Sequence, residues 1–419
     1  MSSTTTSVSS VSSELSDSVR SRRLTPEHEA TVKATLPVIG AHIDEITPIF
    51  YNRMFAAHPE LIRDTFNRGN QRSGGQQKAL AASVATFASM LVDPSAPDPV
   101  AMLSRIAHKH VSLGITADQY QIVHDHLFAA IVEVLGDAVT AEAAEAWDEV
   151  YWLMADVLVG AESGMYREAG VEPGDVFRDA VLTGRRDLSE TVTEFTFTAP
   201  EEFAHARAGQ YVSVGVVLPD GARQLRQYSL VDWGVDGFTI AVQRDGEVSA
   251  ALLDGLAVGD RVDATLPAGD LVLDDRGLAG TVPVVLVSSG IGSTPMTGML
   301  SSLAAAGTAP TVTVIHADED EASYAQREVT DSYVAALRDA GATVHVVTSY
   351  RADGDGVDLA MLAASPGESV LPLGASWYLC GGTGFLQSVR SQLEAEAEVL
   401  RPAAVNVELF SPNDWLLGE

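Results

Sequence analysis

The chain has 419 residues, 46% of them hydrophobic and 20% charged, which is typical of a globular protein long enough for about two to four domains. Its formal net charge of −31 at pH 7 excludes nucleic-acid binding by charge, because phosphate recognition needs a basic face. No apolar run is long enough to span a bilayer, and the single cysteine, Cys380, excludes an internal disulfide framework and favours a reducing cytoplasm.

The first 24 residues are rich in serine and threonine and contain few apolar side chains. We therefore expect residues 1–24 to form a disordered tail. The segment lacks the apolar stretch of a secretory signal. An arginine cluster at Arg20, Arg22 and Arg23 leaves an organelle transit peptide as the alternative, and an unstructured extension is the interpretation we favour.

Residues 25–168 show helical periodicity and few strand patterns. Thr25 and Pro26 make a good N-cap and first-turn pair. Helix breaks are expected near His58, between residues 67 and 75, between residues 94 and 99, at Gly114 and at Gly136. The segment predicts an all-α domain of about six to eight helices.

Two histidines, His108 and His110, lie near the end of a predicted helix but on different faces, so at most one can point at a given site. A second helix is expected to begin at Thr116, where Thr116 and Gln119 would form a capping box. Tyr120 on its first turn would then face a histidine on the preceding helix. Such a partner suits an imidazole that binds iron, because it fixes the tautomer. Either histidine alone is more commonly a packed or solvated residue.

Short alternating segments separated by turn residues predict an antiparallel β-barrel over residues 173–280. Strands are expected at 191–198, 211–217, 224–231, 238–243 and 261–265, with a short helix at 249–253. From residue 281 to residue 419, strands alternate with helices, which predicts a parallel, doubly wound α/β domain. Its buried strands are expected at 284–288, 311–317, 343–349, 377–380 and 405–409.

Several motifs occur in a characteristic order: Ile-Phe-Tyr-Asn-Arg-Met-Phe at 49–55, Thr-Phe-Asn-Arg-Gly-Asn-Gln at 65–71, Lys-His-Val-Ser-Leu-Gly-Ile at 109–115, Arg-Gln-Tyr-Ser at 226–229, Gly-Ile-Gly-Ser-Thr-Pro-Met at 290–296 and Glu-Leu-Phe-Ser-Pro at 408–412. This order resembles that of the flavohaemoglobins, from about Thr25 to the C-terminus. The resemblance implies a multidomain protein: an all-α globin with haem b, an antiparallel β-barrel that binds FAD, and a doubly wound α/β domain that binds NADH or NADPH.

The resemblance places Tyr51 and Gln76 as catalytic residues on the distal face of the haem, with Phe66 and Leu80 in contact with the ring. A tyrosine hydroxyl and a glutamine amide can both donate to iron-bound dioxygen, and a leucine restricts what else enters. Without the motif, Tyr51 and Leu80 would be interpreted as core packing and Gln76 as a solvated residue.

On the proximal face, the resemblance assigns the iron to His110 and places Tyr120 and Glu162 beside it. A carboxylate near the imidazole N–H pushes electron density onto iron and favours oxygen activation over storage. By itself, Glu162 would be interpreted as surface charge.

The predicted flavin site centres on residues 226–229. Arg226 can pair with a phosphate, Tyr228 can stack on the isoalloxazine ring, and the Ser229 hydroxyl can bond the flavin nitrogen that accepts hydride. The resemblance adds a glycine-containing turn near a helix start that would face the FAD pyrophosphate; this turn is shorter and more acidic than is usual in the family. The other implied FAD contacts are Tyr211, Gln227, Gly246, Val248 and Ser249.

The predicted nicotinamide site combines a glycine turn that leads into a helix with two later segments. Glycines let the backbone approach a ligand, and helix amides can face a pyrophosphate. Gly382 replaces the proline usual in the family, which would loosen the later turn. The implied contacts are Gly290, Gly292, Ser293, Thr294, Pro295, Cys380, Gly381 and Phe410, the last covering the flavin. Cys380 can also be a small buried strand residue.

The resemblance implies nitric oxide dioxygenase activity, with dioxygen and nitric oxide as substrates and no obligate protein partner. Acidic residues Asp318, Glu319 and Asp320 follow the second predicted strand of the last domain and favour NADH over NADPH, because carboxylates accept from a ribose hydroxyl and repel a 2′-phosphate. One alternative is a reductase whose acceptor is ferric iron, a quinone or a peroxide. A haem-based gas sensor is the second alternative, but we find no output domain for it.

Overall fold

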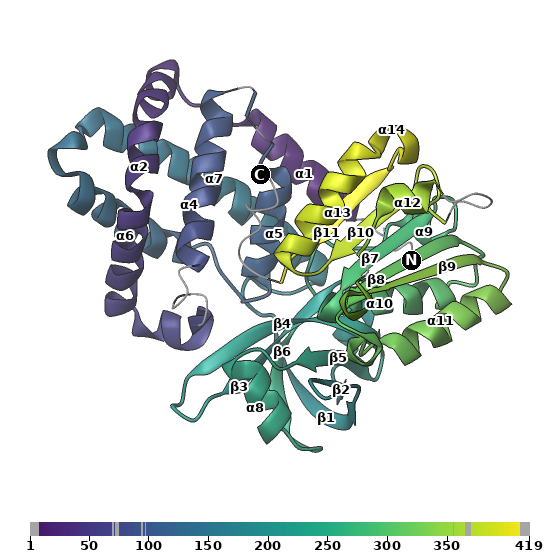
Figure 1. Ribbon diagram of the computed structural model, residues 1–419. Coiled ribbons are helices and arrows are strands. Elements are labelled where there is room, and N and C mark those ends of the chain that lie inside the picture. The colour runs from purple at the N-terminus through teal and green to yellow at the C-terminus, as the bar shows by residue number, and fades with distance from the viewer. Residues whose placement is uncertain are drawn as a thin grey trace, which may run out of the picture. The chain divides into compact units, whose positions relative to one another are not determined.

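The computed structural model describes residues 8–68, 71, 75–93, 95–96, 98–354, 356–364 and 370–410. The chain divides into two compact units: unit 1 comprises Met1–Phe177, Val217–Leu225 and Pro412–Glu419, and unit 2 comprises Arg178–Val216 and Arg226–Ser411. Figure 1 labels the elements of both units. None of the helices in the described ranges combines the length and hydropathy needed to span a bilayer.

Unit 1 is helical, as the periodicity predicts. Its first long helix begins after Thr25, whose hydroxyl accepts a hydrogen bond from the His28 amide, and it continues through Pro37 and Pro48. The described helices that follow the N-terminal segment are α2 (Pro26–Ala57), the π-helical turn η1 (Leu61–Thr65), α4 (Gly75–Val92), α5 (Val100–Val111), α6 (Gln119–Leu135), the 3-10 turn η2 (Gly136–Ala138) and α7 (Ala141–Ala169).

The prediction of a disordered tail is wrong for residues 8–21, because Val8–Ser21 forms helix α1; residues 1–7 of the predicted tail lie outside the described residues. Leu15 and Val19, four residues apart on one helix face, are 3% and 2% exposed and join the core of unit 1. Helix α1 packs against α5 and α7. The serine-rich composition obscured an amphipathic helix, in which Leu15 and Val19 pack against the core.

The first part of unit 2 is a closed barrel with strand order β1-β2-β5-β4-β3-β6, and its described strand pairs are antiparallel. This confirms the predicted barrel. Strand β1 was not predicted, because only Ala180 and Leu182 of its residues are buried and no clear alternation results. The elements are β1 (Phe177–Asp187), β2 (Val192–Thr198), η3 (Glu201–His205), β3 (Tyr211–Val217), β4 (Arg223–Gly234), β5 (Gly237–Gln243), α8 (Glu247–Gly255) and β6 (Arg261–Thr265).

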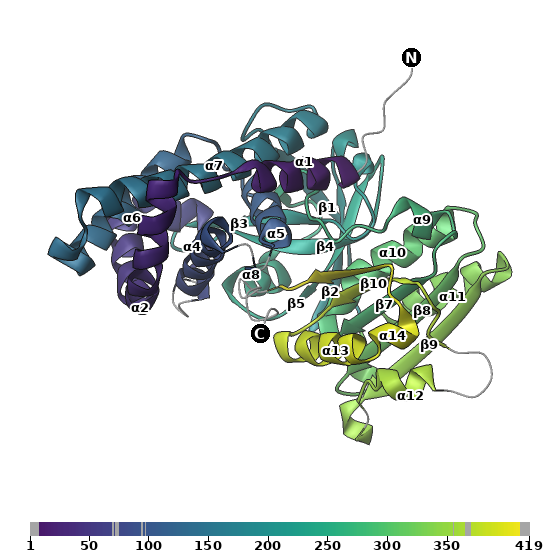
Figure 2. The same cartoon turned by 90° about the horizontal axis from the view of Figure 1, so that it is seen from above.

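The second part of unit 2 is a five-stranded parallel sheet of order β11-β10-β7-β8-β9, which confirms the doubly wound prediction. In Figure 2, α10 and α11 cover one face of the sheet and α12 and α13 cover the other. The elements are α9 (Asp275–Leu278), β7 (Val284–Ser289), η4 (Gly290–Gly292), α10 (Ser293–Ala305), β8 (Thr311–Asp318), η5 (Glu321–Ser323), α11 (Arg327–Asp339), β9 (Thr343–Tyr350), η6 (Arg351–Asp353), α12 (Leu359–Ala363), β10 (Ser376–Cys380), α13 (Thr383–Ala395), α14 (Ala397–Leu400) and β11 (Ala404–Glu408).

Candidate active site

Three helices of unit 1 bring His110, Tyr120 and Glu162 together. Nδ1 of His110 lies 2.8 Å from Oε1 of Glu162 and 3.0 Å from the Tyr120 hydroxyl, and this hydroxyl donates to the same carboxylate oxygen at 2.5 Å. Because a carboxylate only accepts hydrogen bonds, Nδ1 carries the imidazole proton and Nε2 keeps its lone pair for a metal. Of the two histidines in this helix, His110 is the one that contacts the pair.

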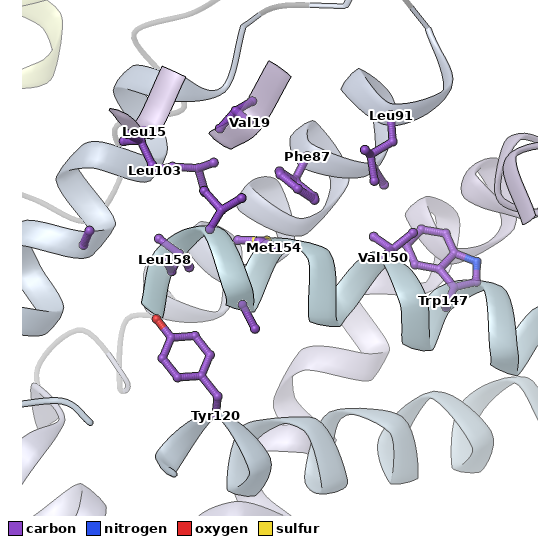
Figure 3. Close-up of a cluster of buried hydrophobic side chains, with 14 of the residues drawn as sticks. Leu15, Val19, Phe87, Leu91, Leu103, Tyr120, Trp147, Val150, Met154 and Leu158 are labelled. Atoms are coloured by element: carbon purple, nitrogen blue, oxygen red, sulfur yellow. The ribbon is translucent and has the colours of Figure 1, made fainter. Parts of the chain in front are cut away.

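Burial and two further tyrosines hold this arrangement. Burial, followed by the charge of Glu162, raises the pKa of Tyr120, so its hydroxyl stays a donor at neutral pH. The Tyr151 hydroxyl donates to the carbonyl of Tyr120 at 2.6 Å, and the Tyr166 hydroxyl donates to the carbonyl of Ile115 at 2.6 Å. Figure 3 shows Tyr120 reaching from α6 toward α7 at the edge of the core.

The turn between α5 and α6 differs in detail from the predicted capping box. The Gln119 side chain accepts from the Thr116 amide at 3.0 Å, which is one half of the box, while the Thr116 hydroxyl donates to Asp118 and helix α6 begins at Gln119. Gly114 adopts φ +72°, where a Cβ would lie 3.0 Å from the Phe177 ring. Glycine is therefore required at this chain reversal.

Tyr51 is 5% exposed and contacts the rings of Phe55 and Phe66. Burial raises its pKa, and a hydrogen bond with the Gln71 side chain partly opposes that shift. Phe66 follows the turn η1 directly. This places two of the predicted distal residues in contact.

Leu80 on α4 lines a narrow apolar pocket of about 30 Å³ that α2, α6 and α7 complete. Its side chain is half-buried and, like that of Phe66, packs against the buried cluster that contains Tyr51. Gln76 lies on the same helix, and its side chain is outside the described residues.

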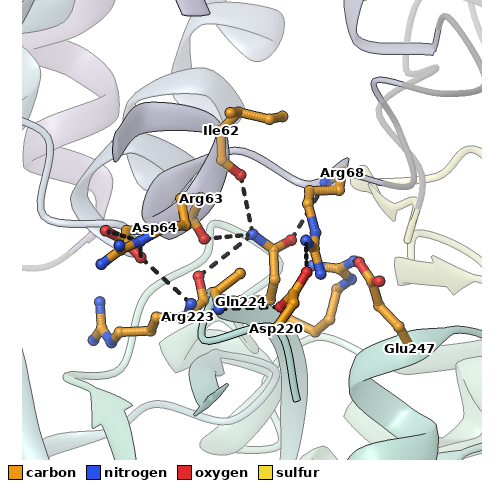
Figure 4. Close-up of polar contacts among 10 residues, drawn as sticks. Ile62, Arg63, Asp64, Arg68, Asp220, Arg223, Gln224 and Glu247 are labelled. Carbon is orange, nitrogen blue, oxygen red and sulfur yellow. Dashed lines mark hydrogen bonds and ion pairs between the residues drawn. The ribbon is translucent and has the colours of Figure 1, made fainter. Parts of the chain in front are cut away.

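The segment Val217–Leu225, which runs from the last residue of β3 to the first three residues of β4, belongs to unit 1 and binds the turn η1 (Figure 4). The Gln224 amide donates to the carbonyl oxygens of Ile62 and Arg63 at 3.2 and 2.9 Å, and its oxygen accepts from the Arg68 amide at 3.3 Å. Arg68 also pairs with Asp220 at 2.6 Å and holds the pKa of that carboxyl low. Gln224 is 1% exposed, so this buried amide satisfies backbone groups next to Phe66.

The residues of the Arg-Gln-Tyr-Ser motif lie on β4. The Gln227 amide donates to the Ser213 hydroxyl at 2.9 Å, and Arg226 lies 3.9 Å from Glu247. Tyr228 is half-buried, and burial raises the pKa of its hydroxyl; Ser229 is 6% exposed. Tyr211 starts β3, and its ring lies 3.0 Å from where a Cβ of Gly269 would be, so a side chain does not fit there.

The turn before α8 uses its polar groups internally. The Ser249 hydroxyl accepts from the amides of Asp245 and Gly246 at 2.9 Å and donates to the Gly246 carbonyl at 3.0 Å. Val248 is 1% exposed. The Ser249 hydroxyl therefore stabilises the start of α8. A phosphate bound at this turn would have to take its hydrogen bonds from other backbone amides of the turn.

The two glycine turns of the parallel sheet lie against each other. A Cβ on Gly292 would lie 2.5 Å from the Cys380 carbonyl oxygen, and one on Gly381 would lie 2.4 Å from Oγ of Ser289. Gly292 is thus needed for contact between the turns, whereas Gly290, with φ +53° and open space around it, leaves its backbone accessible. Cys380 is fully buried, and burial raises the pKa of its thiol.

The helix that follows this turn starts with buried residues. The Ser293 hydroxyl donates to the Gly290 carbonyl and the Thr294 hydroxyl to the Ile291 carbonyl, and Pro295 is buried beside them. These side chains therefore hold the turn in shape. Phe410, at the far end of the described chain, is 51% exposed.

The described residues fit a haem at His110 and a nucleotide at the Gly290 turn, as the sequence implies. In the described ranges, no group of three or more His, Cys, Asp or Glu side chains could hold a metal ion. A single imidazole is the protein ligand that a haem iron takes in globins, and His110 can supply it. The proton on Nδ1 leaves Nε2 for that role. The open backbone at Gly290, with its positive φ, fits a close approach by a nucleotide.

Comparison with known proteins decides the family. Residues 49–158 match the family model described as Globin. The chain is 39% identical over 388 residues to a flavohemoprotein of Bordetella parapertussis, covering 88% of this chain and 94% of the relative, and 34% identical over 393 residues to a flavohemoprotein of Bacillus subtilis, covering 91% and 96%. The chain belongs to the flavohemoprotein family.

A solved structure supports the same conclusion across the whole architecture. The flavohemoglobin from Malassezia yamatoensis, with bound FAD and heme, aligns to this flavohemoprotein with a TM-score of 0.81 and 32% identity, over 93% of this chain and 100% of that chain. The chain is therefore an oxidoreductase with a globin followed by reductase modules. This confirms the resemblance that the sequence motifs indicated.

Four structural residues escaped the sequence analysis. Tyr151 supports Tyr120, Gln71 contacts Tyr51, Gln224 binds η1, and His316 is a buried member of the parallel sheet. Gln71 is the last residue of the motif at 65–71, and Gln224 lies two residues before the motif at 226–229, which is the signal that could have pointed to them. Their partners are distant in the sequence, so spacing alone could not reveal the contacts.

Proposed function

We propose that this flavohemoprotein is an NAD(P)H-dependent nitric oxide dioxygenase that converts nitric oxide and dioxygen to nitrate. The observation that carries the proposal is the contact of Nδ1 of His110 with the Glu162 carboxylate and the Tyr120 hydroxyl. A carboxylate partner raises the basicity of a ligating imidazole, and a more electron-rich iron favours oxygen activation over reversible storage.

Haem b at His110, FAD at the β4 motif and a nicotinamide cofactor at the Gly290 turn are the groups we propose. The Malassezia relative with bound FAD and heme supports the first two. When bound, the haem supplies the iron at which nitric oxide and dioxygen combine, and the FAD converts a two-electron hydride into single electrons.

The side chains of unit 1 then have separate tasks. Nε2 of His110 would hold the iron, and Glu162 would keep the proton at Nδ1. Tyr51 keeps its hydroxyl proton at neutral pH because burial raises its pKa, so it can donate to a bound ligand. Phe66 and Leu80 would exclude water, and Gln76 would supply a second donor.

The test is stopped-flow addition of nitric oxide to the aerobic, NADH-reduced protein loaded with haem and FAD. Each hydride carries two electrons and each nitrate formed from nitric oxide and dioxygen consumes one, so we expect two nitrates per nicotinamide oxidised. Nicotinamide oxidation without nitrate would instead support a reductase for ferric iron, quinones or peroxides. Replacement of His110 by alanine should abolish the haem spectrum while flavin reduction by NADH continues.

A further inference from the structure

The side chains of Ser288, His316 and Asp318 form a hydrogen-bond chain at the carboxyl ends of β7 and β8. Oγ of Ser288 lies 2.9 Å from Nδ1 of His316, and Nε2 of His316 lies 3.2 Å from Oδ2 of Asp318. Ser288 and His316 are 1% and 0% exposed, whereas the Asp318 side chain is 11% exposed. The hydrogen-bond chain therefore runs from the core of the sheet to the Asp318 carboxylate at the edge of the sheet.

The hydrogen-bond chemistry fixes the direction of the chain. A carboxylate only accepts, so Nε2 of His316 donates to Asp318, and Nδ1 of the neutral ring then accepts from the Ser288 hydroxyl. Oδ1 of Asp318 accepts from the Glu319 amide at 2.8 Å. The His316 ring stacks on Tyr324, with ring centroids 3.6 Å apart. Asp318 is thus held from two sides by groups that are themselves fixed.

The geometry does not suit nucleophilic catalysis, although serine, histidine and aspartate are all present. In hydrolytic triads, Nε2 faces the serine and Nδ1 faces the aspartate, whereas here the two nitrogens are exchanged. Ser288 is also buried and out of reach of a substrate. Ser288 and His316 therefore have a structural or positioning role.

The position of Asp318 relates it to the proposed nicotinamide site. Ser288 pairs with His316 in the parallel register and lies two residues before Gly290, so the end of β8 is beside the glycine turn. Ligands of doubly wound sheets bind at the carboxyl ends of the strands, and a carboxylate after the second strand accepts from an adenosine ribose. Asp318 is at that position.

We propose that His316 is a positioning residue that holds the Asp318 carboxylate against the adenosine 2′-hydroxyl and so sets the preference for NADH over NADPH. The inference rests on the proposed use of a nicotinamide cofactor. A carboxylate kept in one orientation accepts from a 2′-hydroxyl and repels a 2′-phosphate; a carboxylate released from His316 rotates, and both effects weaken.

The experiment is calorimetric titration of the haem- and FAD-loaded full chain with ADP-ribose and with 2′-phospho-ADP-ribose. We expect the wild type to prefer ADP-ribose. His316→Leu should weaken ADP-ribose binding about tenfold while 2′-phospho-ADP-ribose binding stays unchanged or improves, because a charge-assisted hydrogen bond is lost. His316→Gln should restore most of the preference, since its amide can donate from nearly the same position.

Thr313→Val is the matched control. Thr313 lies on the same strand, is fully buried, and donates to the Val370 carbonyl, so its loss should lower stability without changing the ratio of the two affinities. If His316→Leu fails to fold, Ser288→Ala should shift the ratio in the same direction by a smaller factor. Equal weakening of both ligands, or no change in the ratio, would overturn the inference.

The two proposals fail in different ways. A protein that discriminates the two ligands through His316 but forms no nitrate would overturn only the dioxygenase assignment. A wild-type protein that binds neither nucleotide would overturn this inference, whatever its reaction with nitric oxide.

Discussion

Oε1 of Glu162 lies 2.8 Å from Nδ1 of His110, so a buried carboxylate on α7 holds the imidazole proton of a residue on α5. Glu162→Gln removes the charge but keeps the size of the side chain. We expect the iron–histidine stretching frequency in resonance Raman spectra to fall and nitrate formation to slow about tenfold or more, because the ligand becomes less basic.

Glu149→Gln is the control for that variant. Glu149 lies on the same helix and also contacts Nδ1 of a histidine, His28, in unit 1. Its replacement should leave the iron–histidine frequency unchanged. An equal fall of the iron–histidine frequency in the two variants would show that the loss of any carboxylate on α7 lowers this frequency. That result would contradict the assigned role of Glu162.

The buried tyrosines predict a loss of stability at alkaline pH. Burial raises the pKa of Tyr324 and of Tyr378 from 10.0 to about 12. The folded protein therefore keeps protons that the unfolded chain releases, so this stability is present below pH 10 and is lost as pH rises through about 12. Thermal melts from pH 8 to 12 should show the melting temperature falling only in that window.

Tyrosinate absorbance at 295 nm, followed in the folded protein, tests the cause of that loss. Tyr324→Phe should reduce the alkaline slope, since one proton-linked group is removed, although its hydrogen bond to Thr330 is also lost. Complete tyrosine ionisation near pH 10 in protein that is still folded would contradict the explanation.

Gly382→Pro should stabilise the protein by about 0.5 to 1 kcal/mol, because proline reduces the freedom of the unfolded chain. Gly382 has φ −69°, which is the angle of proline, and a Cβ there meets nothing within 4 Å. The turn is therefore already in the conformation that a proline would enforce. Gly290 has φ +53°, which proline cannot adopt, so Gly290→Pro should destabilise the protein. Urea denaturation of both variants is the measurement. Similar effects of the two prolines would contradict this account.

Gln224→Leu should destabilise unit 1 by about 1 to 3 kcal/mol, because three backbone groups lose a buried partner. Gln224→Glu should cost more, since it turns carboxylate oxygens toward the carbonyls of Ile62 and Arg63. Urea unfolding followed by haem absorbance is the measurement. Asp220→Asn removes an exposed ion pair with Arg68 and should have little effect on stability. A loss of stability as large as that of Gln224→Leu would contradict the role assigned to the buried Gln224 amide.

Much of this architecture could be predicted from the sequence, because periodicity and turn residues act locally. The predicted bounds 211–217 and 261–265 coincide with β3 and β6. The prediction failed where composition concealed periodicity, as in α1, where Leu15 and Val19 lie among serines. It also failed for β1, whose polar residues show no alternation.

The order of short motifs was enough to indicate the family and the residue types of the site, since the chemistry of iron, flavin and nucleotide binding demands particular side chains at particular spacings. Only the tertiary structure decided that Nδ1 of His110 is the atom that meets Tyr120 and Glu162, that Gly292 serves the neighbouring turn, and that Ser288, His316 and Asp318 form one hydrogen-bond chain. Those contacts join residues far apart in the chain, and their partners are selected by how helices and strands pack, which no local pattern records.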